Sequence, residues 1–411
     1  MFPVVRGFAQ GEGSSRACDH GRVSDAQSRI RQFLTTHAPP TPCLVVDIDA
    51  IVARLREFQG EFPDARLCYA VKANPEPVVI RALAAHGAGF DVASPAEIDL
   101  CIAQGAAPTA LSYGNTIKKP ADIAHAHARG VREFITDSEG DVDNLAEFAP
   151  GAQVCVRLLV DGPPSVTPFG RKFGCEPDVA MDLLRRAAGL GLDTAGLSFH
   201  VGSQQLDLSA WDVCIATAAK LFTELAAEGI LLRRLNIGGG FGLAYSGSAP
   251  SLTDYAEAVQ RSLQSHFPGR QPEVVMEPGR ALVADAGLIR TEVILVARKS
   301  ATDRHRWVYL DIGRYNGLAE TENEYIAYGF ETVAEHGGAE GPVILAGPTC
   351  DGDDVLYQHT PYRLPLDLQA GEQLDILGSG AYTASYSSVA FNGIPPLRTY
   401  CLVGGELTDV A

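Results

Sequence analysis

Long apolar segments, cysteine clusters and an excess of basic charge are all missing from this sequence of 411 residues. No apolar run approaches the ~20 residues that a membrane-spanning helix needs, and residues 1–14 hold no signal-peptide core. The nine cysteines include no Cys-x-x-Cys pair and no Cys/His group, which argues against a disulfide framework or a metal site. A formal net charge of -17 disfavours nucleic acid and membranes as partners. We therefore expect a cytoplasmic protein that acts on small molecules.

The composition favours a folded chain with a sizeable core. Hydrophobic residues make up 46% of the sequence and charged residues 20%, which excludes intrinsic disorder. Eight short apolar, β-rich runs recur with room for a helix between them: Leu67–Val71, Phe90–Ala93, Leu111–Tyr113, Glu133–Thr136, Val154–Val160, Gly196–Phe199, Leu232–Ile237 and Val274–Met276. This alternation predicts a closed, TIM-like (β/α)8 barrel.

The hydrophobic pattern of the sequence changes after Arg280. Strand-like stretches such as Thr291–Ala297 and Val343–Ala346 follow without helical periodicity, which predicts a mainly β C-terminal domain. We expect four segments along the chain: a loose tail over 1–25, an N-terminal segment over 26–46 that associates with the β domain, the barrel over 47–286, and the β domain over 287–411.

Polar residues and glycines stand at the ends of several predicted barrel strands. In such barrels the active site lies at the carboxyl ends of the strands, so these residues would meet at one mouth. They are Lys72, Asp91, Arg157, His200, Gly238, Gly239, Gly240, Glu277 and Arg280. Taken singly, each has a structural explanation, such as a buried histidine, an ion-paired arginine or a tight turn. Their convergence favours a catalytic site.

The chemistry of this set predicts pyridoxal 5'-phosphate as cofactor. Glycine-rich backbone can approach a phosphate, a lysine can form a Schiff base with an aldehyde, and a carboxylate can keep a heteroaromatic nitrogen protonated. A protonated ring withdraws electrons strongly. Loss of CO2 or of a proton from the α-carbon of an amino acid requires such an electron sink.

Seven motifs, in order along the chain, resemble the signatures of the alanine-racemase-fold pyridoxal phosphate decarboxylases, and most closely the bacterial ornithine decarboxylases. The motifs are Tyr69-Ala70-Val71-Lys72-Ala73-Asn74, Phe90-Asp91-Val92-Ala93-Ser94, His200-Val201-Gly202-Ser203, Gly238-Gly239-Gly240-Phe241, Glu277-Pro278-Gly279-Arg280, Gly347-Pro348-Thr349-Cys350-Asp351 and Gly380-Ala381-Tyr382-Thr383. The resemblance begins near Ala26 and runs to the C-terminus. It implies a lyase that converts L-ornithine into putrescine and CO2 for polyamine synthesis.

The resemblance also implies a role for each matching residue. Lys72 would bond covalently to the cofactor, His200 would stack on its ring, and Glu277 would face its pyridine nitrogen. The phosphate would be held by Ser203, Gly238, Gly239, Gly240, Gly279, Arg280 and Tyr382, with Asp91 and Arg157 near the cofactor.

A second subunit would complete each active site. In the family that the sequence resembles, Cys350 protonates the carbanion after CO2 leaves, and Asp351 meets the distal amine of the substrate, both from the partner's β domain. The resemblance therefore implies a head-to-tail homodimer with composite sites. Without its motif, Cys350 would be read as an inert buried thiol.

The segment from Leu318 to Glu324 bears on the choice of substrate. Related bacterial enzymes tend to carry Asp where Asn323 stands, so Asn323, Glu322 and Tyr382 are candidate substrate contacts. Either Glu320 or Glu322 replaces the missing charge, or the distal group is not a simple ammonium. Lysine, arginine or a specialised amino acid of a secondary-metabolite or siderophore pathway are the alternatives, and a solvated acidic turn is the structural explanation. Diaminopimelate is disfavoured because its second carboxylate would need a cationic partner, and the related decarboxylases that act on it usually carry Glu where Asp351 stands.

Residues 161–172, rich in Pro and Gly, form either a connector or a lid over the substrate.

A racemase on the same barrel and a noncatalytic binding protein are the rival functions. Glu277 argues against the first, because racemases of this fold pair the pyridine nitrogen with a weaker, cationic partner. The intact set of Lys72, Glu277 and Cys350 argues against the second.

Overall fold

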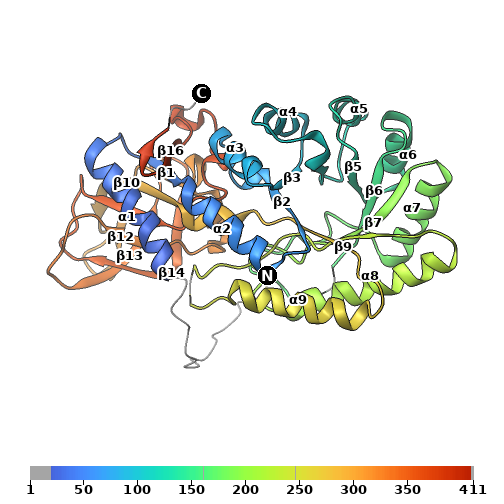
Figure 1. Ribbon diagram of the computed structural model, residues 1–411. Helices are drawn as coiled ribbons and strands as arrows, with labels where there is room; N and C mark the ends of the chain where they lie inside the picture. The colour runs from blue at the N-terminus through green and yellow to red at the C-terminus, as the bar shows by residue number, and fades with distance from the viewer. Residues whose placement is uncertain (1–19, 161, 246, 409–411) are drawn as a thin grey trace.

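The computed structural model describes residues 20–160, 162–245 and 247–408 and divides them into two lobes, a (β/α)8 barrel and a β-rich lobe (Figure 1). The predicted fold class is confirmed. Eight parallel strands close in chain order: β2 (Arg66–Ala70), β3 (Gly89–Val92), β4 (Leu111–Tyr113), β5 (Glu133–Thr136), β6 (Gln153–Arg157), β7 (Asp193–Ser198), β8 (Arg234–Asn236) and β9 (Glu273–Met276). The predicted run Val154–Val160 is too long, because the chain leaves the barrel at Arg157 and Leu158 bridges to Cys175.

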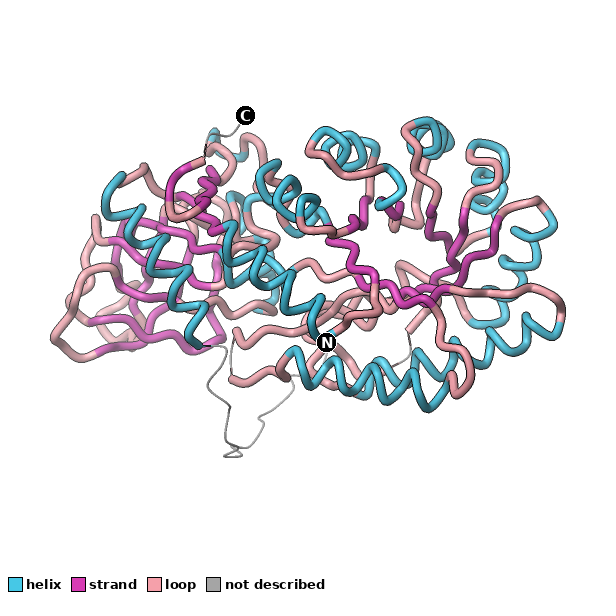
Figure 2. The backbone as a smooth tube through the Cα atoms, in the orientation of Figure 1, coloured by secondary structure: helices cyan, strands magenta, loops and turns pink. Residues whose placement is uncertain are grey.

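Helices surround the barrel strands, as Figure 2 shows. They are α3 (Pro77–Ala85), α4 (Pro95–Ala103), α5 (Pro120–Ala128), α6 (Glu139–Phe148), α7 (Pro177–Gly189), α8 (Ser209–Ala227), α9 (Leu252–His266) and the short α10 (Arg280–Val283). Several begin with proline, whose fixed φ and missing N–H suit the first helical position. At α4 the hydroxyl of Ser94 accepts a hydrogen bond from the Glu97 N–H, and the Glu97 carboxylate accepts one from the Ala93 N–H. These reciprocal bonds cap the helix.

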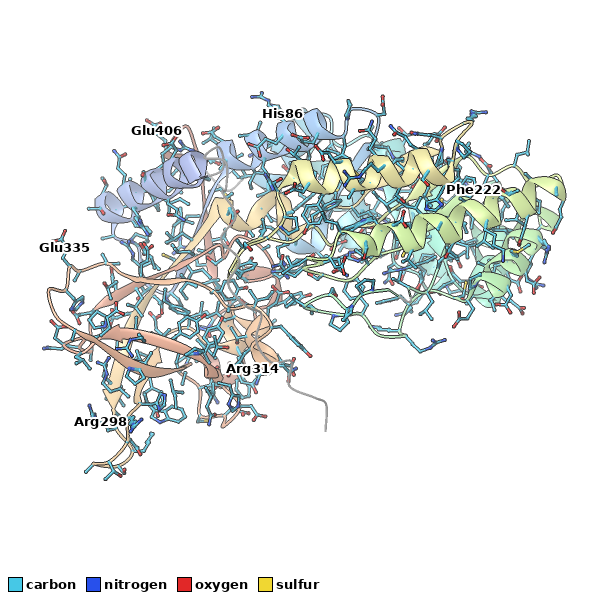
Figure 3. The ribbon with its side chains drawn as sticks, turned by 90° about the horizontal axis from the view of Figure 1, so that it is seen from below. His86, Phe222, Arg298, Arg314, Glu335 and Glu406 are labelled. Carbon is cyan, nitrogen blue, oxygen red and sulfur yellow. The ribbon has the colours of Figure 1, made fainter. Side chains whose placement is uncertain are left out.

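The β lobe is one mixed sheet that includes a strand from before the barrel. Its main path runs β14 (Val355–Pro365), β13 (Glu340–Ala346), β11 (Arg306–Leu310), β10 (Gly287–Ala297), β1 (Cys43–Asp47), β16 (Arg398–Val403) and β17 (Glu406–Leu407). β15 (Gln373–Leu377) pairs with β10 and with β12 (Phe330–Thr332). Helix α1 (His20–His37) packs Ile30 and Phe33 on this sheet, and α2 (Ile48–Glu61) leads into the barrel. In Figure 3, Arg298 lies at the tip of the β lobe far from the barrel, and Arg314 lies on the barrel side.

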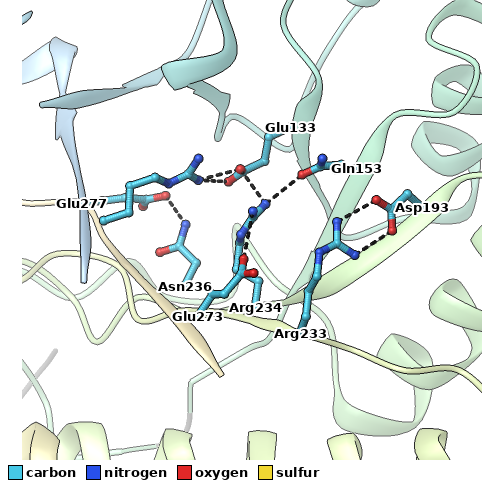
Figure 4. A network of polar contacts seen from close by, with 9 residues as sticks. Glu133, Gln153, Asp193, Arg233, Arg234, Asn236, Glu273 and Glu277 are labelled. Carbon is cyan, nitrogen blue, oxygen red and sulfur yellow. Dashed lines mark hydrogen bonds and ion pairs between the residues drawn. The ribbon is translucent and has the colours of Figure 1, made fainter. Parts of the chain in front are cut away.

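A charged network occupies the amino-terminal end of the barrel (Figure 4). Its members Arg66, Glu133, Gln153, Arg234 and Glu273 are the first residues of five strands. Glu133 is 4% exposed and accepts hydrogen bonds from Arg66 and Arg234, and Arg234 also reaches the side chains of Gln153 and Glu273. This end is therefore filled by ion pairs. The opposite, carboxyl end holds the candidate site.

Candidate active site

One cavity at the carboxyl end of the barrel brings together most of the residues predicted from the sequence. The predicted residues that line it are Lys72, His200, Ser203, Gly240, Glu277, Gly279, Arg280 and Tyr382. They come from the ends of separate strands, from the turn after β9 and, for Tyr382, from the β lobe. Residues far apart in the sequence therefore face the same space.

Lys72 lies in a single 3-10 turn, η1 (Val71–Ala73), directly after β2. Its side chain is 48% exposed, and its Nζ lies 3.3 Å from Oδ2 of the buried Asp91. Burial alone would lower the pKa of the Lys72 amine, but the nearby Asp91, Tyr382 and Glu277 raise it above its ordinary value. The contact with Asp91 therefore favours the ammonium form of Lys72. The amine acts as a nucleophile only after it loses a proton, and the negative charge of Asp91 opposes that loss.

Glu277 follows β9 and accepts a 2.5 Å hydrogen bond from the side-chain amide of Asn236. Burial, together with repulsion from Asp91, raises the pKa of Glu277 to about 7, while Lys72 and Asn236 oppose the shift. A carboxyl group with this pKa can share a proton with a heteroaromatic nitrogen near neutral pH.

His200 presents a neutral ring to the cavity. Its Nδ1 accepts a 3.0 Å hydrogen bond from the Gly202 N–H, so the proton of the neutral ring sits on Nε2. Burial lowers the pKa of His200 well below its ordinary value, and the positive charges of Arg157 and Lys72 lower it further. Phe169 lies against this ring at 4.7 Å between centroids. Arg157 does not line the same cavity; it lines an adjacent one that also contacts His200 and Phe169.

The glycines of the site pack closely against neighbouring backbone. A Cβ at Gly239 would lie 2.5 Å from the carbonyl oxygen of Glu277, and one at Gly240 would lie 2.4 Å from that of Gly202. Gly238 has a φ of 67°, a conformation that side chains disfavour. These positions therefore require glycine, because the loop lies directly against the backbone of its neighbours.

Arg280 is the cation next to this loop, and it is already paired. It is 4% exposed, and its two Nη atoms donate to both oxygens of Glu320, at 2.7 Å and 2.5 Å. The ring of Tyr382 lies 4.8 Å from the guanidinium carbon. The Nε of Arg280 is buried and has no hydrogen-bond partner among the described residues.

The predicted substrate contacts other than Tyr382 lie outside this cavity. Cys350 and Asp351 are exposed in the loop between β13 and β14, and the Cys350 N–H donates to Asn392. Glu322 is exposed and pairs with Arg314, and Asn323 is exposed with a φ of 53°. Asn tolerates this left-handed conformation, so its presence also has a conformational reason.

Sequence reasoning missed several residues of the cavity. Thr167, Phe169 and Tyr386 line it, and Glu320, considered only as a possible substrate contact, reaches Arg280 instead. Asn236, which orients Glu277, was also missed, although its place at the end of β8 was a usable signal. Phe169 and Tyr386 carry no such signal, because they stand on irregular segments.

Comparison with known proteins decides which family this geometry belongs to. Residues 48–284 match the family model described as pyridoxal-dependent decarboxylase, pyridoxal binding domain. The chain is 33% identical to a lysine/ornithine decarboxylase of Selenomonas ruminantium over 355 residues, which cover 86% of this chain and 88% of that one. The chain belongs to the pyridoxal-dependent decarboxylases.

Two further relatives span nearly the whole length of this decarboxylase. An ornithine decarboxylase of Panagrellus redivivus is 32% identical, covering 94% of this chain and 91% of that one. The crystal structure of the Paramecium bursaria Chlorella virus arginine decarboxylase bound to agmatine superposes with a TM-score of 0.83. It is 26% identical and covers 91% of this chain and 100% of the viral one.

The residues present fit pyridoxal phosphate, the cofactor of the family. Ser203, Gly240 and Arg280 line the same cavity, where a hydroxyl, backbone N–H groups and a guanidinium are donors suited to a phosphate. Lys72 is the amine for the aldehyde, the neutral ring of His200 is a flat contact surface, and Glu277 is the carboxyl group for the pyridine nitrogen. Among the described residues, no helix is long and apolar enough to cross a membrane.

Proposed function

We propose that this decarboxylase acts on a basic L-amino acid, with L-ornithine as the first candidate, and releases putrescine and CO2. The observation that carries the proposal is that Lys72, paired with Asp91, and Glu277, held by Asn236, face one cavity. The names of the relatives, ornithine decarboxylase and lysine/ornithine decarboxylase, support a basic substrate.

Each residue of the cavity has a defined task in this reaction. When bound, pyridoxal phosphate accepts the electron pair that departing CO2 leaves on the α-carbon of the substrate. Glu277 holds a proton at the pyridine nitrogen, and Asn236 fixes the direction of its carboxylate. Lys72 would hold the cofactor through its amine, which lies at the cavity wall next to Asp91. Asp91 holds the Lys72 amine in place.

We further propose a homodimer in which each subunit completes the other's site. Cys350 and Asp351 do not line the cavity of their own chain, and both are exposed. Exposed apolar residues lie on the same lobe: Val389 is 82% exposed and Tyr386 is 49% exposed. Such residues are expected on a surface that another subunit covers. In the dimer, Cys350 Sγ delivers a proton to the α-carbon and Asp351 faces the distal ammonium.

The contacts of the acidic turn, residues 318–324, keep lysine, arginine or a specialised amino acid as alternative substrates. Glu320 is bound to Arg280, and Glu324 accepts four hydrogen bonds from residues 358–360 of β14. Neither carboxylate is therefore available to a substrate, which leaves Asn323 and Glu322. A cytoplasmic location stays a prediction.

The deciding experiment is mass spectrometry of the amines formed when the loaded protein meets equal amounts of ornithine, lysine, arginine, diaminopimelate and citrulline. Putrescine as the dominant product supports the first candidate, and cadaverine or agmatine supports an alternative substrate. A D-amino acid in place of an amine would indicate a racemase. Cofactor binding without any product would favour a noncatalytic protein.

A further inference from the structure

The charges of the cofactor cavity are unusual for a site that holds a phosphate. Among its described lining residues, Lys72 and Arg280 are the cations, and Glu277 and Glu320 are the anions. A phosphate monoester carries about -1.5 to -2 charges near neutral pH. Lys72 is committed to the aldehyde end of the cofactor, so Arg280 is the cation left for the phosphate, and Glu320 already neutralises it.

The Arg280–Glu320 pair is built into the protein rather than formed by chance on its surface. Arg280 is 4% exposed and the Glu320 side chain 13%. The guanidinium is flanked by the rings of Tyr382 at 4.8 Å and Tyr245 at 5.8 Å. A buried guanidinium without an anion is costly, so Glu320 stabilises the protein when no phosphate is present.

Glu320 is also held in place by its own turn, η5 (Ala319–Glu324). At the other end of this turn, Glu324 accepts hydrogen bonds from the N–H groups of Gln358 at 2.7 Å and His359 at 2.8 Å. Its second oxygen accepts bonds from the N–H and hydroxyl of Thr360. These contacts anchor the turn to β14. We therefore expect the Glu320 carboxylate to stay near Arg280 when a phosphate binds.

We propose that Glu320 is the resident counter-ion of Arg280, competes with the cofactor phosphate for it, and so sets a weaker cofactor affinity than the site would otherwise have. Two anions then share one guanidinium, and their repulsion opposes binding. Because of this weaker affinity, the fraction of the protein that carries cofactor depends on the cofactor concentration. The inference requires the family's cofactor but neither a particular substrate nor a dimer.

The variant Glu320→Gln tests this by two effects of opposite sign. The apoprotein should melt at a lower temperature, because Arg280 loses its anion. Pyridoxal phosphate should bind more tightly, by about tenfold or more, because the repulsion is gone. Equilibrium dialysis gives the cofactor Kd, and thermal melts with and without inorganic phosphate report the Arg280 subsite independently of Lys72. Phosphate should raise the melting temperature of the variant more than that of the wild type.

A matched control is available on the surface. Glu228 forms a similar two-bond pair with Arg185, but both residues are exposed and lie outside the cavity. Glu228→Gln should leave cofactor and phosphate binding unchanged. Glu320→Asp keeps the charge and should leave the cofactor Kd within about threefold of the wild type.

Either of two results for Glu320→Gln would overturn the proposal. Weaker cofactor binding would mean that Glu320 positions Arg280 for the phosphate, and unchanged binding would mean that it does not affect the subsite. If the apoprotein of the variant does not fold, the protein is purified with cofactor and the rate of cofactor loss on dilution is measured. A slower loss than in the wild type supports the proposal, and an equal or faster loss contradicts it. None of these outcomes depends on which amino acid is decarboxylated.

Discussion

The side chain of Asn236 joins the carboxylate of Glu277 to the glycine loop. Its Nδ2 donates to Glu277 Oε1 at 2.5 Å, and its Oδ1 accepts from the Gly238 N–H at 2.9 Å. One amide therefore fixes both the Glu277 carboxylate and the first glycine of the loop, the groups that we propose for the pyridine nitrogen and the phosphate of the cofactor. Because the amide is neutral, it orients Glu277 without cancelling the repulsion from Asp91.

The raised pKa of Glu277 predicts a pH-dependent stability of the apoprotein. Its folded pKa of about 7 exceeds the unfolded value of about 4.3, so its stabilising effect is present below about pH 4 and is lost as the pH rises through 7. Glu277→Gln removes this dependence. We expect the apoprotein of the variant to gain up to about 3 kcal/mol over the wild type at pH 8 and little at pH 4.5. Urea unfolding at the two pH values measures the difference, and an equal gain at both would refute the assignment.

Lys72→Ala should abolish turnover. The variant loses the amine that bonds to the cofactor and releases product, so kcat should fall by roughly 10³-fold or more. The visible absorbance of lysine-bound cofactor should disappear as well. Lys119, which is exposed on the loop before α5, provides the control Lys119→Ala. Near wild-type turnover by Lys72→Ala would exclude the assigned role.

Mixing two inactive variants tests the composite site. Cys350→Ala should slow product formation by about 10²-fold or divert it to side reactions, because no thiol protonates the α-carbon. Hybrids of Lys72→Ala and Cys350→Ala subunits carry one intact site in each mixed dimer, so random mixing should restore about a quarter of wild-type activity. Activity that stays at the level of the separate variants would place Cys350 in the site of its own chain.

Asn323→Asp tests the substrate preference. Asp also tolerates the positive φ of this position, so the fold should be kept while one carboxylate is added. We expect kcat/KM for ornithine to rise by about tenfold relative to that for arginine, since a compact ammonium gains more from a second anion than a delocalised guanidinium does. Competition assays with paired substrates give this ratio. An unchanged preference would remove Asn323 from the substrate site.

Within residues 161–172, the described part, 162–172, is expected to act as a lid. Hydrogen bonds between the backbones of Thr167 and Ser203 tie the loop to the site, and Phe169 reaches into the cavity against His200. A substrate analogue should therefore slow tryptic cleavage at Arg171 and Lys172 but not at Arg270, an exposed residue between α9 and β9. Equal cleavage at Arg171 with and without the analogue would identify the loop as a connector.

Local signals explain why the barrel and much of the site could be predicted. Short apolar runs mark the strands, and Lys72, His200 and Glu277 stand directly behind them. The pairing of Arg280 with Glu320 joins the two lobes and leaves no local pattern. Tyr382 has a φ of 55°, which an aromatic residue rarely adopts, and its N–H bonds to the Ala73 carbonyl beside Lys72. Such tertiary contacts arise only after the lobes have packed together.

Strand β1 has a consequence for how the protein is made. Val45 pairs with Leu288 of β10 on one side and with Tyr400 of β16 on the other. During synthesis, β1 emerges before the whole barrel and must wait with both edges unpaired until β10 and then β16 are made. A fragment cut after the barrel would separate β1 from both neighbours and expose their edges. The β lobe is therefore not a transplantable module, and a successful domain swap must carry residues 43–47 with it.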